Sequence, residues 1–541
     1  MTGPVRHYLR GHTAVLGATL LVVLGAIVPV VPVLVVPVPA IPVAGFFLVT
    51  PALAQETAFQ VGNDLEGNYD SKLRESVLDN RFDLRVARDM YSVGATLLSH
   101  SPSDYGRLDP NAYGPQEQGI RKRWIEADAG TFFLRAGDSY ATFGRGLVLN
   151  IFEDQTVDFD NVIDGVNARA AWHGLDGEIL SGTNSLGAPE MVLKAGRLSA
   201  SLPHGWKTGI HGAWSDYVAD EARARTGGDR LYGGLLQGAL GPRVDLYGEY
   251  AMRDRRDAAG GPSSDAFARR VPQGHAAYGS AGFNLGPMQL LGECKDLLRY
   301  DRLTVNGTAN GRAWVNPPSV VPQHTTTLMN RATHTPNINF ADERAGLAQV
   351  YVNLPGRSRV DAVYGRSRGR DSGQSAWEAS GEAETWLGEH IELLLRGAET
   401  EETVREGTDL VFFERITWGG TVVAPVHDDW TLDLTVETQG TLESSAGTRS
   451  HEFPVEYRDN VCILTVSSGT GMSWGFTGEW TNDDRSEEDR WLWAEWNLRL
   501  GDRHQLRLGG GSVRGGQVCS GGVCRILDPF EGGRFEFLTT F

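Results

Sequence analysis

Cysteine is scarce in this 541-residue chain, which contains only four, and histidine is sparse at 13. A scaffold held together by many disulfides is therefore excluded, because such scaffolds concentrate cysteine in short chains. The cysteines and histidines also form no sequence cluster that would supply four ligands to a structural zinc ion. The sequence accordingly predicts no metal site and no cofactor.

Positive charge is also in short supply. The chain has 50 lysines and arginines against 68 acidic residues, which gives a net charge of −18. Binding to nucleic acid depends on clustered cations that neutralise phosphates, so a chain this acidic is a poor candidate for it. We predict that nucleic acid is not a partner.

Long apolar runs are confined to the start of the chain. Two arginines precede an apolar stretch, and residues 52–54 (Ala-Leu-Ala) fit a cleavage site, which together are the parts of a secretory signal peptide. Five prolines from Pro29 to Pro42 disfavour a stable helical span, and an uncleaved N-terminal anchor is the alternative. We expect residues 1–54 to be a signal peptide and residues 55–541 to form a barrel with loops.

Apolar and polar side chains alternate along the remainder of the chain. In residues 244–253, Leu246 falls on one face of an extended strand and Glu249 on the other. Residues 82–88 and 492–500 alternate in the same way. Repetition of this pattern in segments of about ten residues is typical of a membrane barrel, whose wall is apolar on one side only.

The chain ends on an alternating strand in which Phe535, Phe537 and Phe541 share one face. In a soluble sheet such a strand would invite edge pairing, whereas in a closed barrel the last strand pairs with the first. This ending resembles the closing strand of bacterial outer-membrane β-barrels, which implies an assembly signal read by the barrel-assembly machinery. Residues 124–170 are also similar to outer-membrane proteins of uncharacterised function, which implies a barrel and no particular activity.

Connections between the alternating segments come in two sizes. Residues 241–243 and 354–357 fit tight hairpins, whereas residues 99–118, 254–275 and 299–343 are long and polar. Short and long connections in turn are typical of a barrel with periplasmic turns and extracellular loops. We predict an all-β fold, a transmembrane antiparallel up-and-down β-barrel of about 20–24 strands, with about 22 favoured.

Residues 137–150 are the least barrel-like part of the chain, because they combine glycines with charges that would be costly facing lipid. We expect this segment to fold inward as a constriction, with Arg145 set against carboxylates that follow it. Opposed charges across a lumen would select solutes by charge and size. An irregular strand pair with a charged loop is the alternative. The candidate pore residues are Asp138, Tyr140, Arg145, Asp154, Asp158 and Asp160.

Signs of catalysis or cation binding in the same region are incomplete. Residues 137–139 (Gly-Asp-Ser) resemble the nucleophile block of the Gly-Asp-Ser-Leu hydrolases, but Tyr140 replaces the leucine and no Asp-x-x-His follows to supply a base. Asp158, Asp160 and Asp164 offer carboxylates, but their spacing does not match a helix–loop–helix calcium site. We therefore predict that the protein is not an enzyme.

Cys519 and Cys524 flank Ser-Gly-Gly-Val, whose glycines let a short loop close. We expect a disulfide between them, which an oxidising periplasm permits. A metal site is the rival interpretation, and two thiolates fall short of four ligands. Cys294 and Cys462 lie in separate strand-like segments and are expected to be unreactive wall or buried residues.

Together these features predict a porin-like channel in the bacterial outer membrane, surrounded by lipid, for the passive passage of small solutes. The alternative is a non-conducting barrel that acts as a scaffold, an adhesin or a component of a secretion or surface-assembly complex. Such a barrel would have an envelope protein as its partner. An open polar lumen is expected only of the channel.

Overall fold

The computed structural model describes residues 57–541 apart from several internal segments. The segments outside the described residues are 102–117, 156–158, 185–189, 219–224, 258–268, 271–273, 301–313, 321–323, 325–326, 333–341, 371, 407–408, 428, 447–454 and 521–522. The predicted signal peptide, residues 1–54, also lies outside them and stays a prediction.

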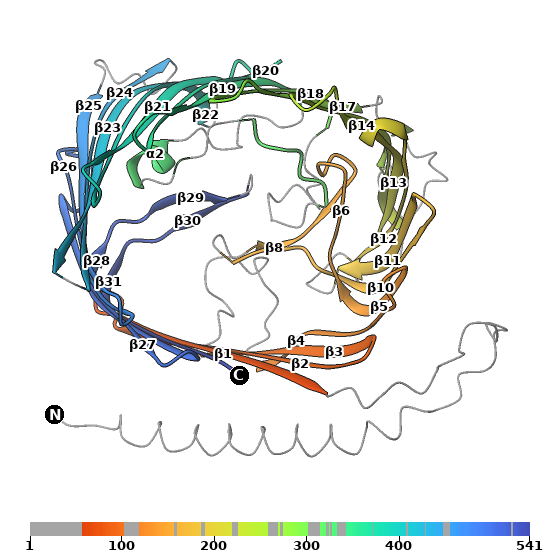
Figure 1. Cartoon of the computed structure of the whole chain (residues 1–541), viewed down its shortest axis with the longest axis horizontal. Coiled ribbons are helices and arrows are strands. Elements are labelled where there is room, and N and C mark those ends of the chain that lie inside the picture. Colours follow the sequence, from red (N-terminus) through yellow and green to blue (C-terminus); the bar gives the residue numbers. More distant parts are fainter. Residues whose placement is uncertain are drawn as a thin grey trace. The chain divides into compact units, whose positions relative to one another are not determined.

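Twenty-four antiparallel strands form one closed ring (Figure 1). The wall strands are β1 (Ala58–Asp70), β2 (Glu75–Arg88), β3 (Tyr91–Ser101), β4 (Gln118–Asp128), β5 (Phe132–Ser139), β10 (Ile163–Trp172), β11 (Leu175–Asn184), β12 (Glu190–Ser201), β13 (Lys207–Val218), β14 (Arg225–Ala239), β15 (Val244–Asp257), β17 (Gly274–Asn284), β18 (Met288–Leu298), β19 (Glu343–Leu354), β20 (Ser358–Gly369), β21 (Ser375–Leu387), β22 (Ile391–Glu406), β23 (Asp409–His427), β24 (Trp430–Ala446), β25 (Val455–Ser468), β26 (Met472–Thr481), β27 (Arg490–Leu500), β28 (His504–Val513) and β31 (Phe530–Thr540). Each strand pairs with the next wall strand along the chain, and β31 closes the ring by pairing with β1.

This architecture confirms the predicted all-β, up-and-down barrel. The observed 24 strands lie within the predicted range and exceed the favoured number by one hairpin. β1 and β31 pair over nine residue positions, from Gly62 opposite Thr540 to Asp70 opposite Gly532, so the ring has no free strand edge.

The outer face of the wall is apolar, and charged residues are buried on the inner face. On β11, Ile179 is 64% exposed, whereas its neighbours Glu178 and Leu180 are 8% and 2% exposed. On β13, Ile210 is likewise exposed while His211 is buried. A soluble protein would bury the isoleucines and expose the charges, so this distribution indicates a wall that faces lipid.

The closing strand shows the same division between its faces. Phe535 and Phe541 are exposed, whereas the Glu536 carboxylate accepts a hydrogen bond from Arg507 at 2.8 Å. The alternation predicted from the terminal sequence is therefore confirmed. The proposed reading of Phe535, Phe537 and Phe541 by the assembly machinery stays a prediction.

The long connections all lie at one end of the barrel, and the other end carries only short turns. The strand order puts the short turns, such as residues 285–287 and 501–503, at the end where β31 finishes. It puts the long connections, including residues 140–162 and 299–342, at the other end. This segregation agrees with the predicted pattern of turns and loops.

Several short elements lie inside the ring in Figure 1, among them β6, β8, α2, β29 and β30. The elements that are not among the 24 wall strands are β6 (Ala141–Phe143), β7 (Leu149–Ile151), β8 (Glu153–Asp154), β9 (Phe159–Asp160), η2 (Pro203–Gly205), β16 (Arg269–Arg270), α2 (Thr327–Ala332), β29 (Gly516–Ser520) and β30 (Val523–Leu527). None of the helices in the described part of the chain is long and apolar enough to cross a membrane.

Candidate functional site in the barrel lumen

The segment predicted to fold inward does enter the lumen, as a hairpin in which β6 pairs with β7. We call residues 140–151 the inner hairpin. At its turn, Gly144 and Gly146 have φ of +60° and +85°, a region that favours glycine. A Cβ added at Gly144 would lie 2.4 Å from a carboxylate oxygen of Glu249. Glycine at this position therefore lets the turn approach the wall.

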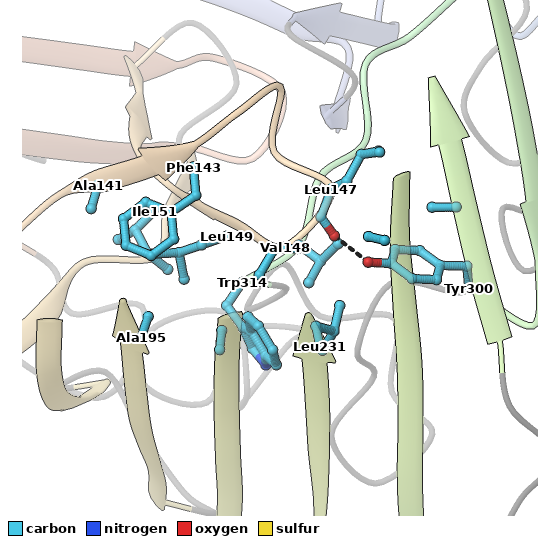
Figure 2. Packing of buried hydrophobic residues seen from close by; sticks show 14 of the residues in the cluster. Ala141, Phe143, Leu147, Val148, Leu149, Ile151, Ala195, Leu231, Tyr300 and Trp314 are labelled. Carbon is cyan, nitrogen blue, oxygen red and sulfur yellow. Dashed lines mark hydrogen bonds between the residues drawn. The ribbon is translucent and has the colours of Figure 1, made fainter. Parts of the chain in front are cut away.

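An apolar seam joins the inner hairpin to one sector of the wall. Phe143, Leu147 and Leu149 are fully buried in it (Figure 2). The wall supplies Leu180, Leu193, Ala195, Ala213, Leu231, Ala251, Ala276, Tyr278 and Leu297, which lie on β11–β15, β17 and β18. The Tyr300 hydroxyl donates a hydrogen bond to the Leu147 carbonyl. Burial of this extent excludes water, so the hairpin packs on the wall as part of a hydrophobic core.

Arg145 projects from the turn of the inner hairpin and is exposed. Its guanidinium carbon lies 5.2 Å from the ring centre of Tyr247 on β15, a cation–π distance. A cavity of about 310 Å³ lies between the turn and the wall, and its lining includes Arg197, Lys207 and His211. The site thus combines three hairpin residues, Thr142, Gly144 and Arg145, with residues of four wall strands, β12 to β15.

Glu249 fixes the turn from the wall side. Its carboxylate accepts hydrogen bonds from the Arg145 backbone N–H at 2.7 Å and from the Tyr247 hydroxyl at 2.6 Å. The other carboxylate oxygen lies 3.2 Å from Nε2 of His211, and both side chains are at most 1% exposed. A carboxylate this deeply buried requires such partners, because its desolvation is otherwise costly.

Tyr140 and Asp160 belong to a separate charged cluster. The Tyr140 hydroxyl donates to Asp160 at 3.2 Å. Lys122 Nζ, from β4, lies 3.1 Å from Asp160 and 2.6 Å from Glu153. Arg81, from β2, lies 3.1 Å from Glu153. This cluster ties the segment after the inner hairpin to the first strands of the wall.

Burial and neighbouring charges shift the pKa values of Tyr140 and Glu153 in this cluster. Burial, followed by the charges of Asp160 and Glu153, raises the pKa of Tyr140, so its phenol remains a hydrogen-bond donor. Burial opposes ionisation of Glu153, but the hydrogen bond and charge of Lys122, with the charge of Arg81, lower the pKa of Glu153. Tyr140 therefore stays neutral and Glu153 stays ionised near neutral pH.

A second attachment to the wall is made of charges. Arg331 of α2 donates to Glu479 of β26, with Nη2 at 3.0 Å. Arg514, which precedes β29, places Nη1 at 2.8 Å from Asp459 and 3.2 Å from Glu479. We call these four residues the charged seam. It holds inner segments against β25 and β26, outside the sector that carries the apolar seam.

Among the described residues, Asp160 and Arg145 do not oppose each other, so the expected arrangement of opposed charges does not extend to Asp160. Asp160 is paired with Lys122, whereas Arg145 lies against Tyr247. The reason is that wall strands supply partners to each side chain, and the sequence of residues 137–164 does not contain those partners.

The other predicted pore residues lie in different parts of the chain's structure. Asp138 is buried at the end of β5, where its carboxylate accepts a hydrogen bond from the Arg123 backbone N–H. Asp154 lies in β8, inside the ring. Asp158 lies outside the described residues. The role of these residues in a pore stays a prediction.

Several wall residues that complete the site are not distinguished by the sequence. These are Lys122, Arg197, Lys207, His211, Tyr247 and Glu249. Alternation does assign Tyr247 and Glu249 to the polar face of their strand, and the structure confirms that assignment. It cannot show which strands the inner hairpin approaches, because that depends on the path of the chain across the lumen.

Cys519 and Cys524 face each other in the register of the β29–β30 hairpin. Their side chains lie outside the described residues, so the disulfide stays a prediction. Cys294 and Cys462 are free thiols in β18 and β25. Among the described residues, no group of three or more His, Cys, Asp or Glu side chains is arranged to hold a metal ion.

Residues 57–188 match a family of unknown function, DUF6029. No curated protein matches the chain. Among solved structures, the copper transporter OprC is similar with a TM-score of 0.42 and 11% identity, over 91% of this chain and 81% of that chain. The P pilus usher PapC translocation pore has a TM-score of 0.43 and 9% identity, over 90% and 99%. The outer-membrane protein OpdK of Pseudomonas aeruginosa has a TM-score of 0.38 and 11% identity, over 74% and 99%.

The functions in these names belong to those proteins. In the present chain, the ring is closed, its outer face carries exposed apolar side chains, and charges are sealed within it. In lipid, the backbone N–H and C=O groups of such a wall can all form hydrogen bonds only if the barrel has no free strand edge. The chain is a membrane-spanning β-barrel of the outer-membrane type, with an even number of antiparallel strands and an apolar outer face.

Proposed function

We propose that the barrel is a channel for the passive passage of small solutes, narrowed by the inner hairpin. The observation that carries this proposal is the one-sided anchoring of that hairpin. Its buried side chains pack on the sector from β11 to β18, while Thr142 and Arg145 are exposed. An element attached to one side of a lumen narrows it without needing support from the opposite wall.

Paired charges on the inner face support the same proposal. Arg253 and Asp229 form a buried pair at 2.9 Å, and Lys295 and Glu343 form another at 3.0 Å. Pairing of this kind holds the wall residues in place while keeping the inner face polar. A polar inner face is what a water-filled passage requires.

Single-channel recording of the mature protein, refolded from residue 55, tests the proposal. Stable conductance steps are expected. In a background without Cys294 and Cys462, Arg145→Cys should react with a bulky water-soluble thiol reagent, and the step size should fall by roughly a third or more. Ile210→Cys, on the outer face, is the matched control and should leave the steps unchanged. A folded, heat-modifiable protein that never conducts would rule the channel out.

A non-conducting barrel in a scaffold, an adhesin or a secretion or surface-assembly complex is the second candidate. It is favoured by α2 and the β29–β30 hairpin, which occupy further space inside the ring (Figure 1). For either function we propose outer-membrane lipid and the barrel-assembly machinery as partners, and for the second also an envelope protein. Co-purification of that protein with a barrel that does not conduct would support the second candidate.

A further inference from the structure

Positive charge gathers at the cavity beneath Arg145. The described residues that line this cavity include Arg145, Arg197, Lys207 and His211, and they include no aspartate or glutamate. The chain as a whole has a net charge of −18. A cationic cavity in an acidic barrel is a local arrangement that the overall composition does not explain.

Two of these basic side chains, Arg197 and His211, are paired with carboxylates of the wall. Arg197 Nε lies 2.8 Å from Glu178, and an Arg197 terminal nitrogen lies 3.3 Å from Asp176. His211 lies 3.2 Å from Glu249. None of these three carboxylates is among the lining residues, so they orient Arg197 and His211 without lining the cavity themselves.

Arg145 and Lys207 differ from that pair. Within the described part of the chain, neither forms an ion pair with a carboxylate. Arg145 is positioned by Tyr247 at 5.2 Å, a contact that uses the face of the guanidinium and not its N–H groups. Lys207 opens β13 and lies opposite Gln237 in the strand register. Two cations therefore face one cavity whose described lining contains no carboxylate.

We propose that this cavity binds a small organic anion whose carboxylate lies between Arg145 and Lys207. The proposal rests on the channel function proposed above, and it names the class of solute that the channel captures. The guanidinium fork of Arg145 suits the two oxygens of a carboxylate, and Lys207 supplies a second charge. Ser199 and Gln237 add polar groups for the remainder of the molecule.

The size of the cavity limits the solute. Its volume of about 310 Å³ is near the lower end of the range, roughly 300–1,000 Å³, that small-molecule sites occupy. An anion with a short carbon chain fits within this volume. Succinate is therefore a suitable probe, with inorganic phosphate and neutral succinamide as comparisons.

Calorimetric titration of the full mature protein in detergent tests the assignment. Succinate should bind, succinamide should not, and Arg145→Ala or Lys207→Ala should each weaken succinate binding roughly tenfold or more. Arg145→Lys, which keeps the charge but loses the two-pronged geometry, should weaken succinate binding less than Arg145→Ala does. Arg507→Ala is the matched control, because Arg507 is already paired with Glu536 at 2.8 Å and Glu495 at 3.5 Å, and it should change the affinity by less than about twofold.

Equal succinate affinity in the wild type and in the folded Arg145→Ala/Lys207→Ala double variant would overturn the proposal. Absence of binding to the wild type, or tighter binding of phosphate than of succinate, would overturn it as well. The channel is tested separately. A protein that conducts but does not bind succinate refutes only the anion site, and one that binds succinate but never conducts refutes the channel.

Discussion

The apolar seam and the charged seam attach inner segments to the same wall by opposite means. In the apolar seam, Phe143 and Leu147 are fully buried among aliphatic wall residues. In the charged seam, Arg331 and Arg514 share the carboxylate of Glu479. The first attachment depends on the exclusion of water, and the second depends on charge pairing that salt can screen.

The difference shows that the inner face of one barrel can have two characters. The sector from β11 to β18 presents small and aliphatic side chains, including Ala195 and Ala213, and therefore holds a hairpin as a protein core would. The sector at β25 and β26 presents Asp459 and Glu479 and holds its segment by ion pairs. We expect the first to be permanent and the second to respond to ionic conditions.

The largest effect is expected from Phe143→Asp, which places a charge at a fully buried position in the apolar seam. Loss of a buried phenylalanine alone costs about 3–5 kcal/mol, and the buried carboxylate adds to that cost. The inner hairpin should detach, so trypsin should cleave after Arg145 in an otherwise folded barrel, as followed by mass spectrometry. Phe143→Leu, the control, should stay protected; equal protection of Phe143→Asp would contradict the seam.

Glu479→Gln should loosen the charged seam, because it removes the charge that Arg331 and Arg514 share. Hydrogen bonds to charged groups contribute about 1.5–3 kcal/mol each when buried, and the partial exposure of both arginines places the effect toward the lower value. Trypsin should then cleave after Arg331.

Salt sharpens the same test. In the wild type, raising NaCl from about 0.1 to 1 M shortens the Debye length from about 10 to 3 Å and should increase cleavage after Arg331 but not after Arg145. Glu443→Gln is the matched control for Glu479→Gln, since Glu443 pairs with Arg485 outside the seam at 2.9 Å. It should leave cleavage after Arg331 unchanged. Equal salt dependence at Arg331 and Arg145 would contradict the distinction between the seams.

Gly144→Ala should have a smaller effect on the apolar seam. Alanine at φ of +60° costs about 1–2 kcal/mol, and the added Cβ would also meet the Glu249 carboxylate. Thermal unfolding should begin at a lower temperature. Gly205→Ala is the control, because Gly205 has φ of +78° with no atom within 4 Å of the added Cβ. If both variants lose the same stability, the contact with Glu249 has no cost of its own.

The smallest effect is expected from pH at the Tyr140 cluster. The pKa of Glu153 is lowered, so its ionisation contributes stability above its ordinary value of 4.5, and the contribution is lost as pH falls through the lowered pKa. Glu153→Gln should therefore reduce the free energy of unfolding at pH 7 by less than about 1 kcal/mol, and by still less at pH 3. Denaturant titrations at the two pH values measure the difference, and a larger loss at pH 3 would contradict the sign.

Much of the fold was predictable because its signals are local. Alternation identified the two faces of β15 and β31, with Glu249 inward and Phe535 outward. Glycine and charge in residues 137–150 identified the segment that leaves the wall. The strand number was predicted less well, because it depends on counting every hairpin, and one omission shifts it by two.

The site was only half predictable. Arg145 was selected for its place in an irregular, glycine-rich segment. Its partners Tyr247 and Glu249, and Lys207 on the same cavity, lie in wall strands that resemble many others. The same limitation explains why the sequence did not show that Asp160, one of the carboxylates that follow Arg145, pairs with Lys122.

The sequence by itself determined the architecture of the wall, because side-chain alternation and turn chemistry act within a few residues and repeat along the chain. Only the tertiary structure decided which wall sector receives the inner hairpin, which carboxylates hold α2, and which cations gather at one cavity. Those contacts join positions as far apart as Leu147 and Tyr300, and they depend on the registers of all the strands between them. No local pattern encodes a distance across a lumen, since that distance exists only once the ring has closed.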